Sequence, residues 1–238
     1  MYTSSMTNSE IVEEFKKDLR FLDIKNENWL TDFRRAALKS SKFPCIRTYQ
    51  QKMSSNNIIY VLFMASVRGK HNNPDVCVYS VYDYNKKKRV ITRTPTTNNK
   101  ILPFYAENRY SNDGDYTILP DHFLERYQER VLKNQEMSKM DVINHCMSNL
   151  KVLISIEIND DLENVYHCFE GHYDNNNKVK FDYVSACSFG YNFGIIENNI
   201  SIIKTVITKE QLKKNQRELF PLIKIMQEET ESRYLNRK

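Results

Sequence analysis

Four runs of β-branched and aromatic residues that follow Pro44 constrain the fold more than any other feature of the chain. Residues of these types favour strands, and short segments rich in Ser, Asn, Gly and Lys separate the runs. Apolar residues fill most of the second run, which is typical of a central strand. Because short turns join antiparallel neighbours, the pattern predicts an antiparallel meander. Its predicted strands cover residues 45–52, 57–68, 76–84 and 88–94.

Two helical patterns precede the meander and predict a helical pair at the N-terminus. The first covers residues 9–21, with Ser9 as a candidate N-cap, and the second covers residues 29–38. In both, apolar residues recur at the spacing of one helix face. Basic residues decorate the second helix, and we interpret them as a solvated face, with contact to a polyanion as the alternative. These residues are Arg34, Arg35, Lys39 and Lys42.

The second half of the chain predicts two helices followed by a sheet. The first helix lies in the stretch 118–132, with Asp121 as its N-cap and Pro120 keeping the chain from being helical earlier, and Ser138 caps the second. Residues 151–158 fit either a continuation of that helix or a strand. Thr208 then caps a final helix that runs to about residue 233. A loop at 95–117 precedes the first of these helices. Between the second helix and the final one we predict strands at 166–171, 179–189 and 200–207, a bend or bulge at 190–194 and a turn at 198–199.

These elements together predict an α+β fold, in which an antiparallel β-sheet packs against helices. The helical pair and meander occupy residues 1–100, and the helix–helix–sheet part occupies residues 101–238. With 238 residues, 40% of them hydrophobic, the chain can bury a core, and the two parts can also form one compact domain. No apolar run approaches the roughly 20 residues that a membrane helix needs, and the polar start does not resemble a signal peptide. We therefore expect a cytoplasmic protein with no membrane partner.

Composition excludes several classes of site. The chain has only five glycines and neither a Walker pattern nor G-x-G-x-x-G, which excludes glycine-rich phosphate loops. Its five cysteines include no Cys-x-x-Cys pair, so we interpret them as reduced core residues rather than as a disulfide framework or zinc site. The acidic group Asp160, Asp161 and Glu163 is interpreted as a turn rather than a metal site. We therefore expect neither a metal nor a cofactor.

The helix predicted at 118–132 carries the strongest candidate for chemistry. The apolar residues of this helix would face a core. His122, Arg126 and Arg130 recur four residues apart and would share an adjoining stripe of the helix surface. An imidazole in the first turn with two guanidiniums behind it suits a phosphate group. The alternative is a solvated face, because Glu125 and Glu129 can form ordinary surface ion pairs with the arginines.

Lys204 and Thr205 lie near the middle of the last predicted strand. A helix with His122, Arg126 and Arg130, followed by strands and such a late strand, resembles the small barnase/RelE-like ribonuclease fold of bacterial toxins and phage-associated proteins. The resemblance covers at most residues 115–220.

This resemblance implies metal-independent RNA cleavage, in which the ribose 2′-hydroxyl attacks the neighbouring phosphate. His122 would act as the acid–base group, and Arg126 and Arg130 would stabilise the charge that develops on the phosphoryl oxygens. Lys204 or Thr205 would bind the phosphate.

Two other functions remain open. One is a non-catalytic protein-interaction module of a phage or mobile element, and the other is RNA or DNA binding without cleavage. The net charge of +5 permits nucleic-acid binding without requiring it. Tyr79, Tyr82 and Tyr84 could stack bases, although aromatic residues on strands more often pack in a core. RNA and a protein partner or inhibitor are thus the candidate partners, and the sequence does not indicate an oligomeric state.

Overall fold

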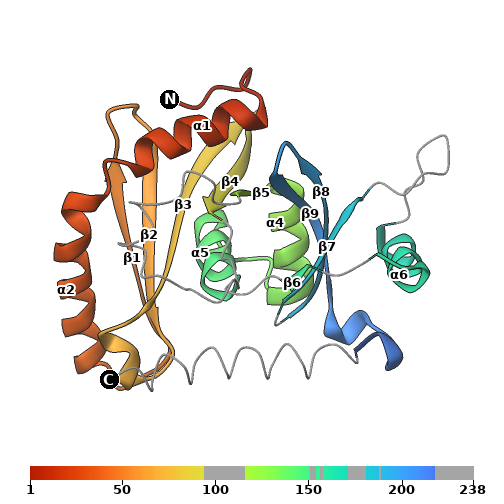
Figure 1. Ribbon diagram of the computed structural model, residues 1–238. Coiled ribbons are helices and arrows are strands. Elements are labelled where there is room, and N and C mark those ends of the chain that lie inside the picture. Colours follow the sequence, from red (N-terminus) through yellow and green to blue (C-terminus); the bar gives the residue numbers. More distant parts are fainter. Residues whose placement is uncertain (94–115, 151–153, 156–157, 171–180, 188, 218–238) are drawn as a thin grey trace.

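A single nine-stranded sheet runs through the computed structural model, which describes residues 1–93, 116–150, 154–155, 158–170, 181–187 and 189–217 (Figure 1). The strand order is β1-β2-β3-β4-β5-β9-β8-β7-β6. Neighbouring strands are antiparallel except for β5 and β9, which are parallel. The strands are β1 (Cys45–Lys52), β2 (Ile58–Ala65), β3 (Asp75–Tyr84), β4 (Lys87–Arg93), β5 (Tyr116–Leu119), β6 (Ile154–Ser155), β7 (Tyr183–Cys187), β8 (Gly190–Glu197) and β9 (Ile200–Thr208).

The meander predicted after Pro44 is confirmed as β1 to β4, with strand ends shifted by at most a few residues. Its turns use residues with positive φ, at Asn56 between β1 and β2 and at Asn85 and Lys86 between β3 and β4. Asn adopts the left-handed conformation more readily than most residues, which fits its place in these tight turns. Within the sheet, Tyr79 and Tyr82 are buried, so they pack in the core and are not open to bases.

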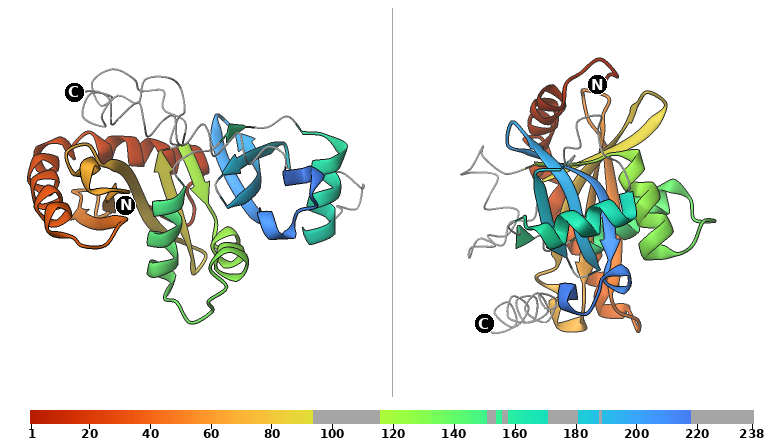
Figure 2. Two further views of the ribbon diagram at one scale, coloured as in Figure 1. Left: turned by 90° about the horizontal axis from the view of Figure 1, so that it is seen from below. Right: turned by 90° about the vertical axis from the view of Figure 1, so that its right-hand side faces the viewer.

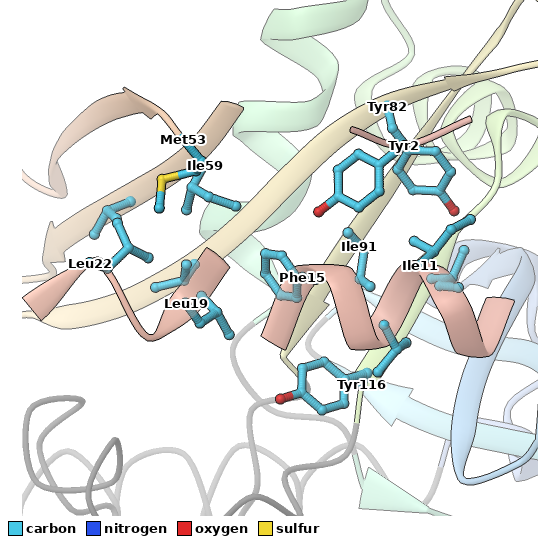
Figure 3. Packing of buried hydrophobic residues seen from close by; sticks show 14 of the residues in the cluster. Tyr2, Ile11, Phe15, Leu19, Leu22, Met53, Ile59, Tyr82, Ile91 and Tyr116 are labelled. Carbon is cyan, nitrogen blue, oxygen red and sulfur yellow. The ribbon is translucent and has the colours of Figure 1, made fainter. Parts of the chain in front are cut away.

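Helices α1 (Asn8–Leu19) and α2 (Asp23–Lys39) cover one face of the meander and confirm the predicted helical pair. The start of α1 differs from the prediction, because Thr7 and Glu10 form the capping box and Ser9 lies inside the helix. The buried side of α1, which includes Phe15, packs over Ile59 and Ile91 of the strands (Figure 3).

The opposite face of the sheet is covered by α4 (Asp121–Tyr127) and α5 (Lys139–Asn149) (Figure 2). A π-helical turn, η2 (Gln128–Leu132), extends α4. Ser138 caps α5 as predicted, accepting a hydrogen bond from the Asp141 backbone N–H at 3.2 Å. Helix α6 (Asp160–Glu170) packs on β7, β8 and β9 from the side opposite to α4 and α5. Each helical layer therefore buries one set of alternating strand residues.

Helix α4 starts at Asp121, one residue before the predicted N-cap would place it, and the predicted side-chain cap is wrong. Residues 118–119 belong to β5, and Pro120 occupies the N-cap position. Asp121 does not cap the helix through its side chain. Its Oδ1 atom lies 2.9 Å from Lys139 Nζ and connects α4 to the start of α5.

The strand predicted at residues 166–171 is also wrong, because residues up to Glu170 belong to α6. Leu162, Val165 and Tyr166 are spaced for one helix face and pack against the sheet together. The carboxylates of Asp160, Asp161 and Glu163 lie in the first turn of α6, where the helix dipole favours negative charge. The acidic group is therefore part of a helix start and not of a turn.

The remaining predictions are met in part. Strands β7 and β9 correspond to predicted strands, β6 supplies a short strand within 151–158, and Asn198 and Asn199 have the positive φ of a tight turn. After Thr208 the structure has the short 3-10 turns η3 (Lys209–Gln211) and η4 (Asn215–Arg217) in place of the start of a long helix. The rest of that predicted helix, and most of the loop predicted at 95–117, lie outside the described residues.

Candidate functional site

His122 and Arg126 both lie near carboxylates on the surface of α4. The His122 side chain is half exposed, and its Nδ1 atom is 3.9 Å from Glu125 Oε2. The Arg126 Nη1 atom lies 2.8 Å from Glu129 Oε2. Arg126 therefore forms the surface ion pair that is the alternative to phosphate binding. One side of its guanidinium faces the Glu129 carboxylate.

Arg130 leaves this surface and crosses the sheet. Its Nη1 atom donates to the Val206 carbonyl at 2.8 Å and to Thr205 Oγ1 at 3.3 Å, and its Nη2 atom donates to the Phe169 carbonyl at 3.5 Å. Because β5 pairs with β9 only as far as Ile202, the guanidinium occupies the position beside β9 that β5 no longer fills. One side chain thus connects η2, β9 and the C-terminal end of α6.

The structure brings together two of the five predicted site residues, Arg130 and Thr205. Thr205 is only 1% exposed, and Arg130 donates to two backbone carbonyls besides the Thr205 hydroxyl. Such a contact satisfies buried polar groups and leaves little room for a phosphate. We infer that Arg130 and Thr205 serve the fold.

Lys204 is the extra residue of a β-bulge. The pairing of β8 with β9 passes from Phe193↔Thr205 to Gly194↔Ile203, so Lys204 has no residue opposite it on β8. The prediction of a bend or bulge at residues 190–194 is met in part, because these residues belong to strand β8 and the extra residue of the bulge lies opposite them on β9. Lys204 is partly buried and belongs to the same strand segment as Thr205, whereas His122 lies on the exposed start of α4.

An unpredicted polar contact connects α4 to α5. The buried Tyr127 hydroxyl lies 3.1 Å from His145 Nδ1. Burial raises the pKa of Tyr127 and lowers the pKa of His145, which favours the uncharged form of both side chains. The two residues belong to different helices, and no spacing rule could have paired them.

The cysteines are all free thiols. Cys146 and Cys187 are buried, as expected of core residues, and burial raises the pKa of the Cys187 thiol to about 11. Cys168 is exposed on α6, which corrects the prediction for that residue. Over the part of the chain that the structure describes, no group of three or more His, Cys, Asp or Glu residues could hold a metal ion.

Comparisons with protein-family models, with curated proteins and with solved structures found no match to this chain. The barnase/RelE-like resemblance therefore stays a prediction. Among the helices within the described ranges, none is both long and apolar enough to cross a membrane.

A second candidate site follows from the distribution of charge in the N-terminal half. Residues 33–74 contain no Asp or Glu, although the whole chain has 30. Since the net charge of the whole chain is only +5, the remaining residues are acidic on balance. The Lys and Arg residues of this segment are Arg34, Arg35, Lys39, Lys42, Arg47, Lys52, Arg68 and Lys70.

The fold brings most of these cations to one end of the sheet. The 3-10 turn η1 (Arg68–His71) packs against α2, and two hydrogen bonds fix it there. Arg34 Nη2 donates to the Asn72 carbonyl at 3.1 Å, and Arg68 Nη2 donates to the Ser40 carbonyl at 3.0 Å. Helix α2 lies alongside β1 in Figure 1, so the segments of α2, β1 and η1 that carry the exposed cations lie side by side.

We call five exposed residues of this region the basic surface: Arg35, Lys39, Lys42, Arg47 and Arg68. Among the described residues, no carboxylate makes an ion pair with any of the five. Sequence reasoning named the cations of α2 but missed Arg47 and Arg68. The long interval without a carboxylate was the signal that could have found them.

Proposed function

We propose that this protein binds nucleic acid through the basic surface and that binding does not depend on cleavage. The observation that carries the proposal is the concentration of cations from α2, β1 and η1 on one end of an otherwise acidic chain, where no carboxylate of the described residues makes an ion pair with them. The clustered cations repel one another, and a bound polyanion offsets this repulsion. The counter-ions that the polyanion releases on binding add to the affinity. A phosphodiester backbone supplies the regularly spaced negative charges that such a surface fits.

Reversing two charges on the outer side of α2 should weaken this binding. For R35E/K39E we expect at least about a tenfold loss of affinity for a single-stranded RNA and for a DNA of the same sequence. The plot of log affinity against log salt should become shallower by roughly 1.4, because two phosphate contacts are lost at about 0.7 each. Fluorescence anisotropy of labelled oligonucleotides across a salt series measures both quantities.

The matched control is K213E/K214E, which makes the same change of charge at two exposed lysines near η4. Equal losses in the two variants would show that only net charge matters, and the proposed surface would then be wrong. Anionic phospholipid vesicles form a further arm, since Leu38 and Val67 are exposed close to these cations. Binding to vesicles without binding to RNA or DNA would assign the surface to membranes.

The ribonuclease predicted from α4 is a second candidate, favoured by one observation. His122 is half exposed in the first turn of α4, one turn before Arg126. If this candidate is right, H122A should lose about 10²–10⁴-fold in cleavage of a mixed RNA pool in EDTA while it binds RNA and melts like the wild type. Cleavage that is equal in the two proteins, or undetectable in the wild type, would exclude His122 as the acid–base group.

A further inference from the structure

Two aromatic rings stack at the surface where α2 lies alongside β1. The rings of Trp29 on α2 and Tyr49 on β1 have centroids 5.7 Å apart and an interplanar angle of 16°. Both side chains are partly exposed. The Tyr49 hydroxyl donates to Asp32 Oδ2 at 2.6 Å, which holds the tyrosine ring against the helix.

This ring pair borders the basic surface. Strand β1 runs back along α2 after the turn at residues 40–44, so Tyr49 lies beside the middle of α2 while Cys45 lies near its C-terminal end. Arg47 is two residues from Tyr49 and therefore points to the same side of the sheet. Burial raises the pKa of Tyr49, and the nearby Arg47 guanidinium opposes that shift.

From the ring pair toward the C-terminal end of α2, the border thus presents two aromatic rings, then Arg47, then Lys39 and Lys42. The acidic residue Asp32 lies at this border, and its carboxylate accepts the hydrogen bond from Tyr49. Aromatic rings followed by a row of cations are the combination by which proteins bind single strands, with bases on the rings and phosphates on the cations. A duplex keeps its bases stacked on one another and cannot use the rings.

We propose that this border binds single-stranded nucleic acid, with a base against the exposed part of the Trp29–Tyr49 pair and the following phosphates along Arg47, Lys39 and Lys42. The inference rests on the proposed function, which it narrows to one class of ligand. RNA and DNA single strands share the chemistry that the border recognises. The rings contribute preference for unpaired bases, and the cations contribute the salt-dependent part of the affinity.

Trp29 is the only tryptophan of the chain, so fluorescence excited at a wavelength that tyrosine does not absorb reports on this border. The unmodified full chain is titrated with a single-stranded RNA, a single-stranded DNA of the same sequence, the corresponding DNA duplex, and an abasic strand with the same number of phosphates. We expect saturable quenching by one or both single strands and none by the abasic strand. The ratio of the RNA and DNA affinities shows which sugar is preferred.

The second measurement uses variants. W29A should lose roughly 5- to 150-fold in affinity for the single strand, and W29F should recover most of that loss, because phenylalanine retains an aromatic face. Y84A is the matched control, since Tyr84 is a partly exposed strand residue that also lies beside a cation, with the Arg89 guanidinium 3.8 Å from its ring centroid. Its affinity should stay at the wild-type value. Thermal melts accompany all three variants, and the quenching measured on the unmodified chain decides the question even if W29A fails to fold.

The outcomes separate this inference from the proposal on which it rests. Equal binding of single strand, abasic strand and duplex without quenching would overturn the inference and leave nucleic-acid binding by charge intact. Absence of binding to every nucleic acid would overturn both.

Discussion

Replacing Arg130 with methionine is expected to lower the free energy of unfolding by about 2–4 kcal/mol. Methionine keeps an unbranched apolar stem but removes the donors that reach the Val206 and Phe169 carbonyls and the Thr205 hydroxyl. Hydrogen bonds from a charged donor contribute more than neutral ones, and acceptors left unpaired in a buried place add their desolvation cost. The cation also lies at the C-terminal end of α6, where the helix dipole favours it. Urea unfolding followed by circular dichroism measures the change.

The matched control is R126M, one helical turn earlier. Arg126 forms an ion pair with Glu129, whose side chain is exposed. Loss of this pair should lower the free energy of unfolding by less than about 1 kcal/mol. Equal destabilisation by the two substitutions would contradict the structural role given to Arg130. An R130M protein that is fully stable but unable to act on RNA would instead place Arg130 in a ribonuclease site, as the resemblance implies.

Substituting Gly190 with alanine is expected to destabilise the protein by about 3 kcal/mol or more. A Cβ atom at this position would lie 2.0 Å from the Ile207 carbonyl oxygen and 2.8 Å from Thr208 Cα. Both atoms belong to the backbone of β9, so they can move only if the two central strands separate. For a chain of this size, 3 kcal/mol corresponds to a fall in Tm of roughly 6–12 °C.

The control for Gly190 is S201A, a partly exposed position on the same strand β9 where alanine adds no atom. Its effect should stay within about 0.5 kcal/mol. A G190A protein with a wild-type melting curve would show that β8 and β9 are further apart at this point than the structure places them.

The parts of the fold that the sequence predicts well are those whose determinants are local. Strands β1 to β4 each combine β-branched residues with turn residues at both ends, and Ser138 provides the start of α5 by itself. Strand β5 was not predicted, because Ile118 and Leu119 border the helical pattern and only pairing with β4 and β9 shows that they form a strand. Such pairing is not local.

The arrangement of the candidate site residues could be predicted only in part, for a related reason. Regular helical spacing puts His122, Arg126 and Arg130 on one stripe, but the π-helical turn η2 changes the direction of the third residue. Spacing also cannot say whether a guanidinium meets Glu129, a strand carbonyl or a phosphate. The concentration of positive charge is easier to predict, because the lack of Asp and Glu in residues 33–74 is visible in the sequence. The contact between η1 and α2 is not predictable in this way, because it depends on the completed sheet.

The parallel pair β5–β9 has a consequence for how the chain folds. The meander β1–β4 is built from contacts between neighbours in sequence, so it can form early and quickly as the chain is synthesised. The second edge of β5 finds its partner only when β9 arrives, as in the pairing of Ile118 with Ile202. Until then that apolar edge is open to pairing with another chain. We therefore expect the pairing of β5 with β9, which joins the two halves into one sheet, to be the slow and aggregation-prone step of folding.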